Sequence, residues 1–350
     1  MVQLLSFGLT IIAALALTSF VDAAPRRCVV AQSKTDGYIT IVQAFNDCRS
    51  GGTVVFPKDK SYYIKNMIKI ENLKDVYIDF QGKVYLPAYD KKFRGQSAFL
   101  TLKGENVNMS GGGSFIDAKD VNALTVLRNT LKNSQLGHFK ILNSLRAHMG
   151  IISAENVVLH NLYFKSASSN SNRPMNTDAL QISSTKNLLV KDSELIVDDD
   201  CTGITVSNVK CVSGHGFSIG SLGKGGSTEN VKDVTIINSE CSNCQNGFIN
   251  VKLPNSENPI IVTAYYCDKN QMNFCQKNGN KSLNISGVTF TNISGYASTV
   301  KKNPIVNFDC AKDTPCSNFS VSGINIKGHS KTPKNVCNNL RDSGKIGVCR

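Results

Sequence analysis

Three consecutive aspartates stand between two apolar runs in the stretch SELIVDDDCTGITV, residues 193–206. Runs of acidic residues are typical of solvated turns, so Asp198, Asp199 and Asp200 are first of all loop candidates. Adjacent carboxyl groups also perturb each other's ionisation, and a pair of them is what general acid and base catalysis requires. The acidic run therefore marks either a turn or an active site.

Two other short motifs lie on either side of this run. An NTD triplet ends at Asp178, and a GHG triplet is centred on His215. In a coiled repeat, residues about one turn apart stack on one face, which brings Asp178, Asp199, Asp200 and His215 toward one cleft. Inverting glycoside hydrolysis needs one protonated carboxyl group and one carboxylate, roughly 6.5–9.5 Å apart, with water between them. The three motifs in this order predict that chemistry.

The elements that must position these motifs are short strands with one recurring pattern. A small polar residue or glycine comes first, then an apolar residue, any residue and another apolar residue. Such steps of roughly 16 to 50 residues, without long amphipathic helices, are typical of a solenoid. We expect an all-β, right-handed parallel β-helix rather than an antiparallel sandwich, with left-handed backbone at the corners. The pattern begins at Asp75, Asn106, His138, Asn156, Asn187, Gly203, Asp233, Ser282 and Asn318.

A short helix is predicted ahead of these strands. Ile41, Val42, Ala44 and Phe45 have helical spacing and end near Cys48, which suits a cap over the open end of the solenoid. The stretch GGTVVFP, residues 51–57, then predicts a turn and the first strand. No linker divides the chain, so residues 24–350 are expected to form one domain.

The chain begins with a segment typical of secretion. Residues 1–23 contain an apolar stretch from Leu9 to Leu17 and end in a V-D-A site that suits signal peptidase. This apolar stretch is too short for a membrane span, and no second one of about 18 residues follows. We expect a secreted, extracellular protein that does not insert into a membrane.

All twelve cysteines follow this segment, and an even number in an oxidising compartment favours disulfides. Local pairs are expected for Cys28 with Cys48, Cys201 with Cys211, Cys267 with Cys275, Cys310 with Cys316, and Cys337 with Cys349. Cys241 and Cys244 have no second CxxC, so zinc is a weak interpretation and their pairing stays open. Glycosylation acceptors are expected at Asn108, Asn280, Asn284, Asn292 and Asn318.

The formal net charge of +13 favours anionic partners. Secretion argues against nucleic acid, which leaves an anionic surface or an acidic polysaccharide, and a purely solubilising charge is the alternative. The sequence offers no spacing that would hold a metal, and the two-carboxylate chemistry needs no cofactor. We expect a monomer.

The chain resembles a polygalacturonase, a member of family 28 of the glycoside hydrolases. The resemblance lies in NTDALQIS, DDC, CVSGHGFSIGSLGKGG and ENVKDVTIINSEC, with GGTVVFP near the start. It implies a right-handed parallel β-helix that hydrolyses α-1,4-linked galacturonate in pectin with inversion. It also implies that Asp199 is the general acid, that Asp178 and Asp200 activate water, that His215 supports the site, and that Cys201 bridges to Cys211. The stretch SIGSLGK is similar to that of exo-acting members.

Two positions depart from the family pattern. Its Arg-Ile-Lys motif, whose cations bind the substrate carboxylate, reads Asn250-Val-Lys252 here. The lost guanidinium contact is worth about 1.5–3 kcal/mol. The chain also enters the next strand directly after Cys201, so the turn with the aspartates is shortened. The alternatives are therefore a catalytically impaired protein that binds pectin, or a hydrolase of rhamnogalacturonan or xylogalacturonan. Other substrate contacts expected from the motifs come from Asn176, Gly214 and Gly216.

Overall fold

The structure is a computed structural model, and it describes most of the chain after residue 24. The described ranges are 25–87, 90–93, 95–116, 125–144, 147–166, 178–193, 201–216, 230–246, 251–265 and 284–350. For residues 201–203, 212–216, 230–232, 241–246, 251–256 and 284 only the backbone is described.

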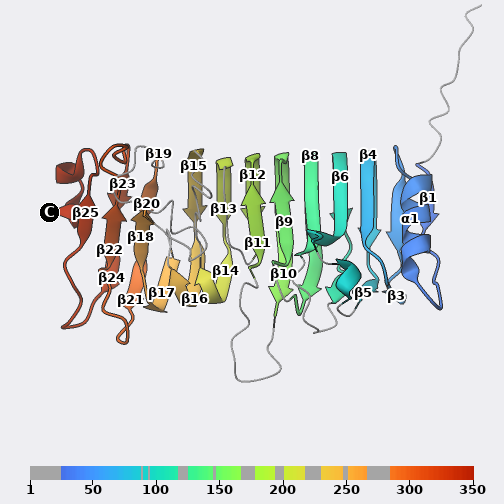
Figure 1. Ribbon diagram of the computed structural model, residues 1–350, viewed down its shortest axis with the longest axis horizontal. Helices are drawn as coiled ribbons and strands as arrows, with labels where there is room; N and C mark the ends of the chain where they lie inside the picture. The colour runs from blue at the N-terminus through green and yellow to red at the C-terminus, as the bar shows by residue number, and fades with distance from the viewer. Residues whose placement is uncertain are drawn as a thin grey trace, which may run out of the picture.

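Strands dominate the described residues, and every described strand pair is parallel. Figure 1 shows them side by side along the long axis, from α1 and β1 at one end to β25 at the other. Successive strands of each sheet come from successive turns of the chain, which is the architecture of a parallel β-helix. The predicted fold class is confirmed.

The largest described sheet follows the chain in the order β1-β2-β4-β6-β8-β10-β12-β13-β15-β19, with β3, β5, β7, β9 and β11 attached beside this path. Its strands are β1 (Arg27–Val29), β2 (Thr53–Phe56), β3 (Ser61–Tyr63), β4 (Ile68–Phe80), β5 (Lys83–Tyr85), β6 (Ala98–Ser110), β7 (Ser114–Ile116), β8 (Thr125–Leu142), β9 (Met149–Ile152), β10 (Glu155–Lys165), β11 (Leu180–Ser183), β12 (Thr185–Lys191), β13 (Cys201–Ser207), β15 (Asn230–Ile237) and β19 (Asn284–Ile285).

Smaller described sheets continue the solenoid toward the C-terminus. The first contains β14 (Lys210–Gly216), β16 (Ser239–Asn246), β17 (Val251–Ser256), β21 (Ser294–Ala297) and β24 (Asn325–Lys327). The others pair β18 (Ile260–Thr263), β22 (Val306–Asp309) and β25 (Val336–Asn338), and β20 (Thr289–Thr291) with β23 (Ser320–Ser322). Short 3-10 turns lie at η1 (Lys91–Phe93), η4 (Ser343–Lys345) and η5 (Gly347–Cys349).

A helix covers the N-terminal end, as predicted. α1 spans Gly37–Asp47, and its N-cap Asp36 accepts a hydrogen bond from the Tyr38 N–H at 3.0 Å. Its buried face includes Ile41 and Phe45, and Phe45 packs 6.3 Å from Phe56 between ring centroids. The prediction that residues 51–57 supply the first strand was wrong. β1 precedes the helix and pairs with β2, because three residues suffice for a strand when a neighbour completes its hydrogen bonds.

The corners have the predicted left-handed backbone, but most of them lie inside a described strand, which continues through the corner, rather than in front of one. Seven of the nine residues that begin the recurring pattern have φ between 51° and 56°: Asp75, Asn106, His138, Asn156, Asn187, Asp233 and Asn318. Asparagine and aspartate tolerate this conformation better than other residues with a side chain. Their side chains also form a ladder along the outside, in which Asn187 donates to Asn156 at 2.9 Å and Asn156 donates to Asn133 at 2.8 Å.

The core is a set of side-chain columns, because parallel registers place equivalent residues of adjacent coils next to each other. Phe80 stacks on Phe115 with 4.6 Å between ring centroids, and Phe139 packs edge-on against both. One column contains a polar residue: Asn129, in register with Leu102 and Ile151, is fully buried. Neither its amide nitrogen nor its amide oxygen has a hydrogen-bond partner among the described residues.

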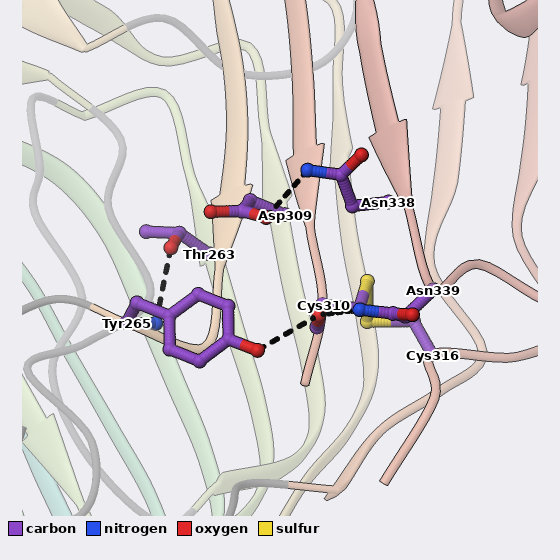
Figure 2. Close-up of a disulfide and its surroundings, with 7 residues drawn as sticks. All are labelled: Thr263, Tyr265, Asp309, Cys310, Cys316, Asn338 and Asn339. Carbon is purple, nitrogen blue, oxygen red and sulfur yellow. Dashed lines mark hydrogen bonds between the residues drawn. A yellow bond between two sulfur atoms is a disulfide. The ribbon is translucent and has the colours of Figure 1, made fainter. Parts of the chain in front are cut away.

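Three of the predicted disulfides are confirmed: Cys28–Cys48, Cys310–Cys316 and Cys337–Cys349. Figure 2 shows that the Cys310–Cys316 bridge lies beside a polar cluster. The Cys310 carbonyl accepts from Asn339 Nδ2 at 2.9 Å and from the Tyr265 hydroxyl at 3.4 Å. This disulfide therefore fixes a backbone turn that side chains of two other coils also hold.

Candidate active site

Asp178 is the predicted catalytic residue whose surroundings the structure describes best. It is half-buried and lies two residues before β11. Its carbonyl oxygen accepts a hydrogen bond from the backbone N–H of His148, on the preceding coil, at 2.7 Å. The next ladder bond runs from Met149 N to the Ala179 carbonyl at 3.1 Å. The backbone at Asp178 is thus fixed by the sheet that β9 and β11 form.

His148 makes a second contact with the same carbonyl group. Its Nδ1 lies 3.1 Å from the Asp178 carbonyl oxygen, and its Nε2 lies 3.1 Å from Ser166 Oγ. The Ser166 hydroxyl donates to the Ser144 carbonyl at 2.6 Å. The imidazole also stacks on Phe164, with 5.4 Å between ring centroids and 4° between the planes. Both ring nitrogens therefore face oxygen atoms in a packed site beneath Asp178.

Burial decides the charge of this histidine. Desolvation lowers the pKa of His148 from its ordinary value, more than the nearby Asp178 and Lys165 carbonyls and the Asp178 charge raise it. The ring is accordingly neutral near pH 7. A neutral, stacked imidazole that contacts the carbonyl of Asp178 is a positioning residue, because it orients the backbone from which that carboxyl group projects.

The GHG motif and Lys252 lie on strands of another sheet. Gly214, His215 and Gly216 belong to β14, and Gly214 and Gly216 pair with Cys244 and Asn246 of β16. Lys252 belongs to β17, where it pairs with Glu240 of β16. The structure thus brings the predicted histidine and lysine onto strands that share one neighbour, β16. Their side chains are outside the described part.

Several predicted residues lie outside the described residues. These are the proposed signal peptide, residues 1–23, and Asn176, Asp199, Asp200, Asn250, Cys267, Cys275 and Asn280. Cys211 is buried in β14, but the side chain of Cys201 is not described, so their disulfide stays a prediction. Glycosylation also stays a prediction; Asn108, Asn292 and Asn318 are exposed, and Asn284 is described by its backbone alone.

The shortened turn after Cys201 is visible in the strand register. β13 begins at Cys201 itself, which pairs with Thr185 at the start of β12. β11, which follows Asp178, pairs with β9 and with no other described strand. The coil that carries the DDC motif therefore adds β13 beside β12, and no described strand of that coil pairs with β11.

Two residues near Asp178 escaped sequence reasoning. Aligning AHMGIIS, residues 147–153, with DALQISS, residues 178–184, would have placed His148 beside Ala179, as the register does. Arg128 lies one coil earlier, in register with Gly150, and nothing in its local sequence marks it. Among the described residues, no group of three or more metal-binding side chains is present, and no helix is long and apolar enough to cross a membrane.

Comparison with known proteins identifies the family. Residues 52–346 match the protein-family model described as Glycosyl hydrolases family 28. The chain belongs to this family. It is thus a glycoside hydrolase, and the resemblance drawn from its motifs is confirmed.

Individual relatives agree with this family assignment. An exopolygalacturonase of Rhizopus delemar is 42% identical, over 100% of this chain and 99% of that protein. A second exopolygalacturonase of the same organism is 40% identical, over 99% of this chain and 96% of that protein. Among solved structures, the endo-xylogalacturonan hydrolase of Aspergillus tubingensis superposes with a TM-score of 0.75 at 22% identity, covering 90% of this chain and 96% of that one. This structural likeness supports the right-handed parallel β-helix fold alone.

Proposed function

We propose that this family-28 hydrolase is a secreted, exo-acting polygalacturonase that cleaves α-1,4-galacturonosyl linkages of pectin. The observation that carries the proposal is the identity of 40–42% with exopolygalacturonases over nearly the whole length of both chains. A relative named for xylogalacturonan hydrolysis is 26% identical, so polygalacturonate is the favoured substrate. The net charge of +13 agrees with an acidic polysaccharide.

The proposed reaction is hydrolysis with inversion. Asp199 donates its proton to the glycosidic oxygen as the bond to the anomeric carbon breaks. Asp178 and Asp200 take a proton from a water molecule that attacks this carbon from the opposite face. His215 supports the site, and Lys252 binds the substrate carboxylate beside Asn176, Asn250, Gly214 and Gly216. The products are a new reducing end and a new hydroxyl group on the leaving unit.

The described structure supports this proposal at Asp178. The backbone bond from His148 and the stacked imidazole behind it hold the residue in place, as a preorganised catalytic group requires. The three disulfides agree with secretion, because such bonds persist in oxidising compartments. The mature chain is proposed to begin after residue 23 and to act as a monomeric single domain.

The test is release of reducing ends from polygalacturonate by the purified mature chain. The wild-type protein should release monogalacturonate, while Asp178→Asn and Asp199→Asn should each lose at least about 100-fold in rate, the lower range for a general acid or base. Mixed oligomers among the early products would contradict exo action. Equal activity in wild type and Asp199→Asn would contradict the assigned acid, and no hydrolysis by any form would favour a protein that only binds pectin.

A further inference from the structure

A small hollow with both polar and apolar walls opens on the outer surface of the sheet that carries Asp178. It has a volume of about 100 Å³. The residues that line it come from four successive coils: Ser97, Thr125, Arg128, Gly150, Ile152 and Gln181. We refer to it as the Arg128 hollow.

The strand register explains why a hollow forms at this place. Arg128 of β8 pairs with Gly150 of β9, and Gly150 pairs with Gln181 of β11. Since neighbouring strands lie about 4.8 Å apart, the Arg128 and Gln181 backbones are about 10 Å apart, with a residue that lacks a side chain between them. The hollow is open because Gly150 has no side chain to fill the gap between Arg128 and Gln181.

The backbone does not require glycine at this position. A Cβ atom added to Gly150 would meet its nearest neighbours, in Ile152 and Thr125, at 3.8 Å, which is ordinary contact. Its φ also lies outside the left-handed region. Neither backbone strain nor crowding therefore requires glycine at position 150. The effect of the glycine is to leave the hollow between Arg128 and Gln181 open.

Arg128 is a cation with donors to spare. It is half-buried and donates from Nη1 to Ser97 Oγ at 3.0 Å. Among the described residues, no carboxylate lies within ion-pair distance of its guanidinium group. A guanidinium has five N–H donors in a planar fork that matches a carboxylate, so the remaining ones suit an anion that enters the hollow.

The hollow lies next to the candidate catalytic residue. Gln181, which lines the hollow, is a residue of β11 and lies three positions after Asp178 in the sequence. A ladder of backbone bonds connects the two sites, from Leu127 N to the His148 carbonyl at 3.2 Å and from His148 N to the Asp178 carbonyl at 2.7 Å. Arg128 is offset from Asp178 by two strand spacings across the sheet and by three residues along it, which together amount to roughly 14 Å. A polysaccharide bound at Asp178 would therefore reach the Arg128 hollow by running obliquely across this face.

We infer that the Arg128 hollow is a substrate subsite that binds the carboxylate of a galacturonate unit, with Arg128 as its cationic ligand. The inference rests on the proposed polygalacturonase function. It gives the chain a guanidinium contact on the catalytic face, although Asn250 stands where the family has arginine. Thr125 and Gln181 are polar groups within the same hollow that can hydrogen-bond the sugar.

The decisive measurement is the dissociation constant of trigalacturonate, taken by calorimetry in an Asp178→Asn background so that hydrolysis does not interfere. Adding Arg128→Gln should weaken binding about 10- to 100-fold, as expected for one charge-assisted hydrogen-bonded pair. Arg128→Lys should lie between the two, because an ammonium keeps the charge and loses the fork. Gly150→Val should weaken binding similarly by filling the hollow.

The matched control is Arg341→Gln, the same change at an exposed arginine near the C-terminal end of the solenoid. It should change binding by less than about twofold at 0.15 M salt, where distant charges are screened. The inference is overturned if Arg128→Gln and Gly150→Val both bind like the parent, or if Arg341→Gln loses as much as Arg128→Gln. Melting temperatures identify any variant that fails to fold.

Failure of the proposed function would look different. In that case the wild-type protein hydrolyses no polygalacturonate, yet the binding comparison still decides whether the Arg128 hollow takes a uronate carboxylate. Conversely, full hydrolysis with unchanged binding in Arg128→Gln and Gly150→Val leaves the function standing and removes the subsite.

Discussion

The unpartnered Asn129 predicts that a single substitution will stabilise the protein. Its side chain is fully buried in a column between Leu102 and Ile151, and neither amide group has a hydrogen-bond partner among the described residues. Each buried unsatisfied polar group costs about 1–3 kcal/mol. Replacing Asn129 by leucine removes two such groups and continues an aliphatic column.

The expected gain follows from those terms. Two unsatisfied groups contribute roughly 2–6 kcal/mol, and fitting a bulkier side chain into a packed core costs roughly 1–3 kcal/mol. The central values of these two ranges, about 4 and about 2 kcal/mol, give an expected rise in the free energy of unfolding of roughly 2 kcal/mol for Asn129→Leu. Urea unfolding of wild type and variant at pH 7, followed by circular dichroism, measures this as a higher midpoint at unchanged slope.

The control is Asn108→Leu, the same replacement at an exposed position of β6. Asn108 accepts a hydrogen bond from the Gln135 N–H at 3.2 Å, so this variant should be neutral or less stable by up to about 1 kcal/mol. An Asn129→Leu variant less stable than wild type would refute the reasoning, since it would mean that the amide has a partner, such as an internal water, that leucine displaces.

Two further predictions concern His148 and the asparagine ladder. Burial lowers the pKa of His148, so below about pH 6.5 the unfolded chain binds a proton that the native protein does not. Stability should therefore fall by up to about 1.4 kcal/mol per pH unit from pH 6.5 down to the native pKa. His148→Phe should remove that part of the slope in urea unfolding at pH 7.5 to 5, and identical slopes would contradict it. At Asn156, with φ of 54°, glycine should be tolerated better than alanine by about 1–2 kcal/mol, because only alanine is strained there. The order of the two melting temperatures tests this, and a more stable alanine variant would show that strand propensity outweighs corner strain.

The sequence predicted the parts of the fold that repeat within each coil. The polar residue in front of each alternating apolar pair predicted both the strands and the left-handed corners, such as those at Asn106 in β6 and Asp233 in β15. The spacing of Ile41 and Phe45 predicted α1. These features depend on local backbone preference and on which face of a strand is buried, and both are visible in a few consecutive residues.

Features that depend on the register between coils could not be predicted in the same way. The coils differ in length: His148, whose backbone bonds to Asp178, is 30 positions away in the sequence, and Thr125, one coil beyond it, is 53 positions away. β1 was missed because three residues carry too little pattern, and the Arg128 hollow because it is defined by an absent side chain on a neighbouring coil. Asn129 breaks the apolar pattern that identified the core.

The ladder of asparagine side chains at the corners also has a consequence for folding kinetics. Its hydrogen bonds join residues 23 and 31 positions apart, so each coil needs only its immediate neighbours to complete its contacts. Such a chain can nucleate at one coil and add others in sequence, and it can lose them from its ends in reverse order. The end coils are those with a neighbour on one side alone, and they carry Cys28–Cys48 and Cys337–Cys349. These two disulfides therefore oppose stepwise unfolding at the two places where it would begin.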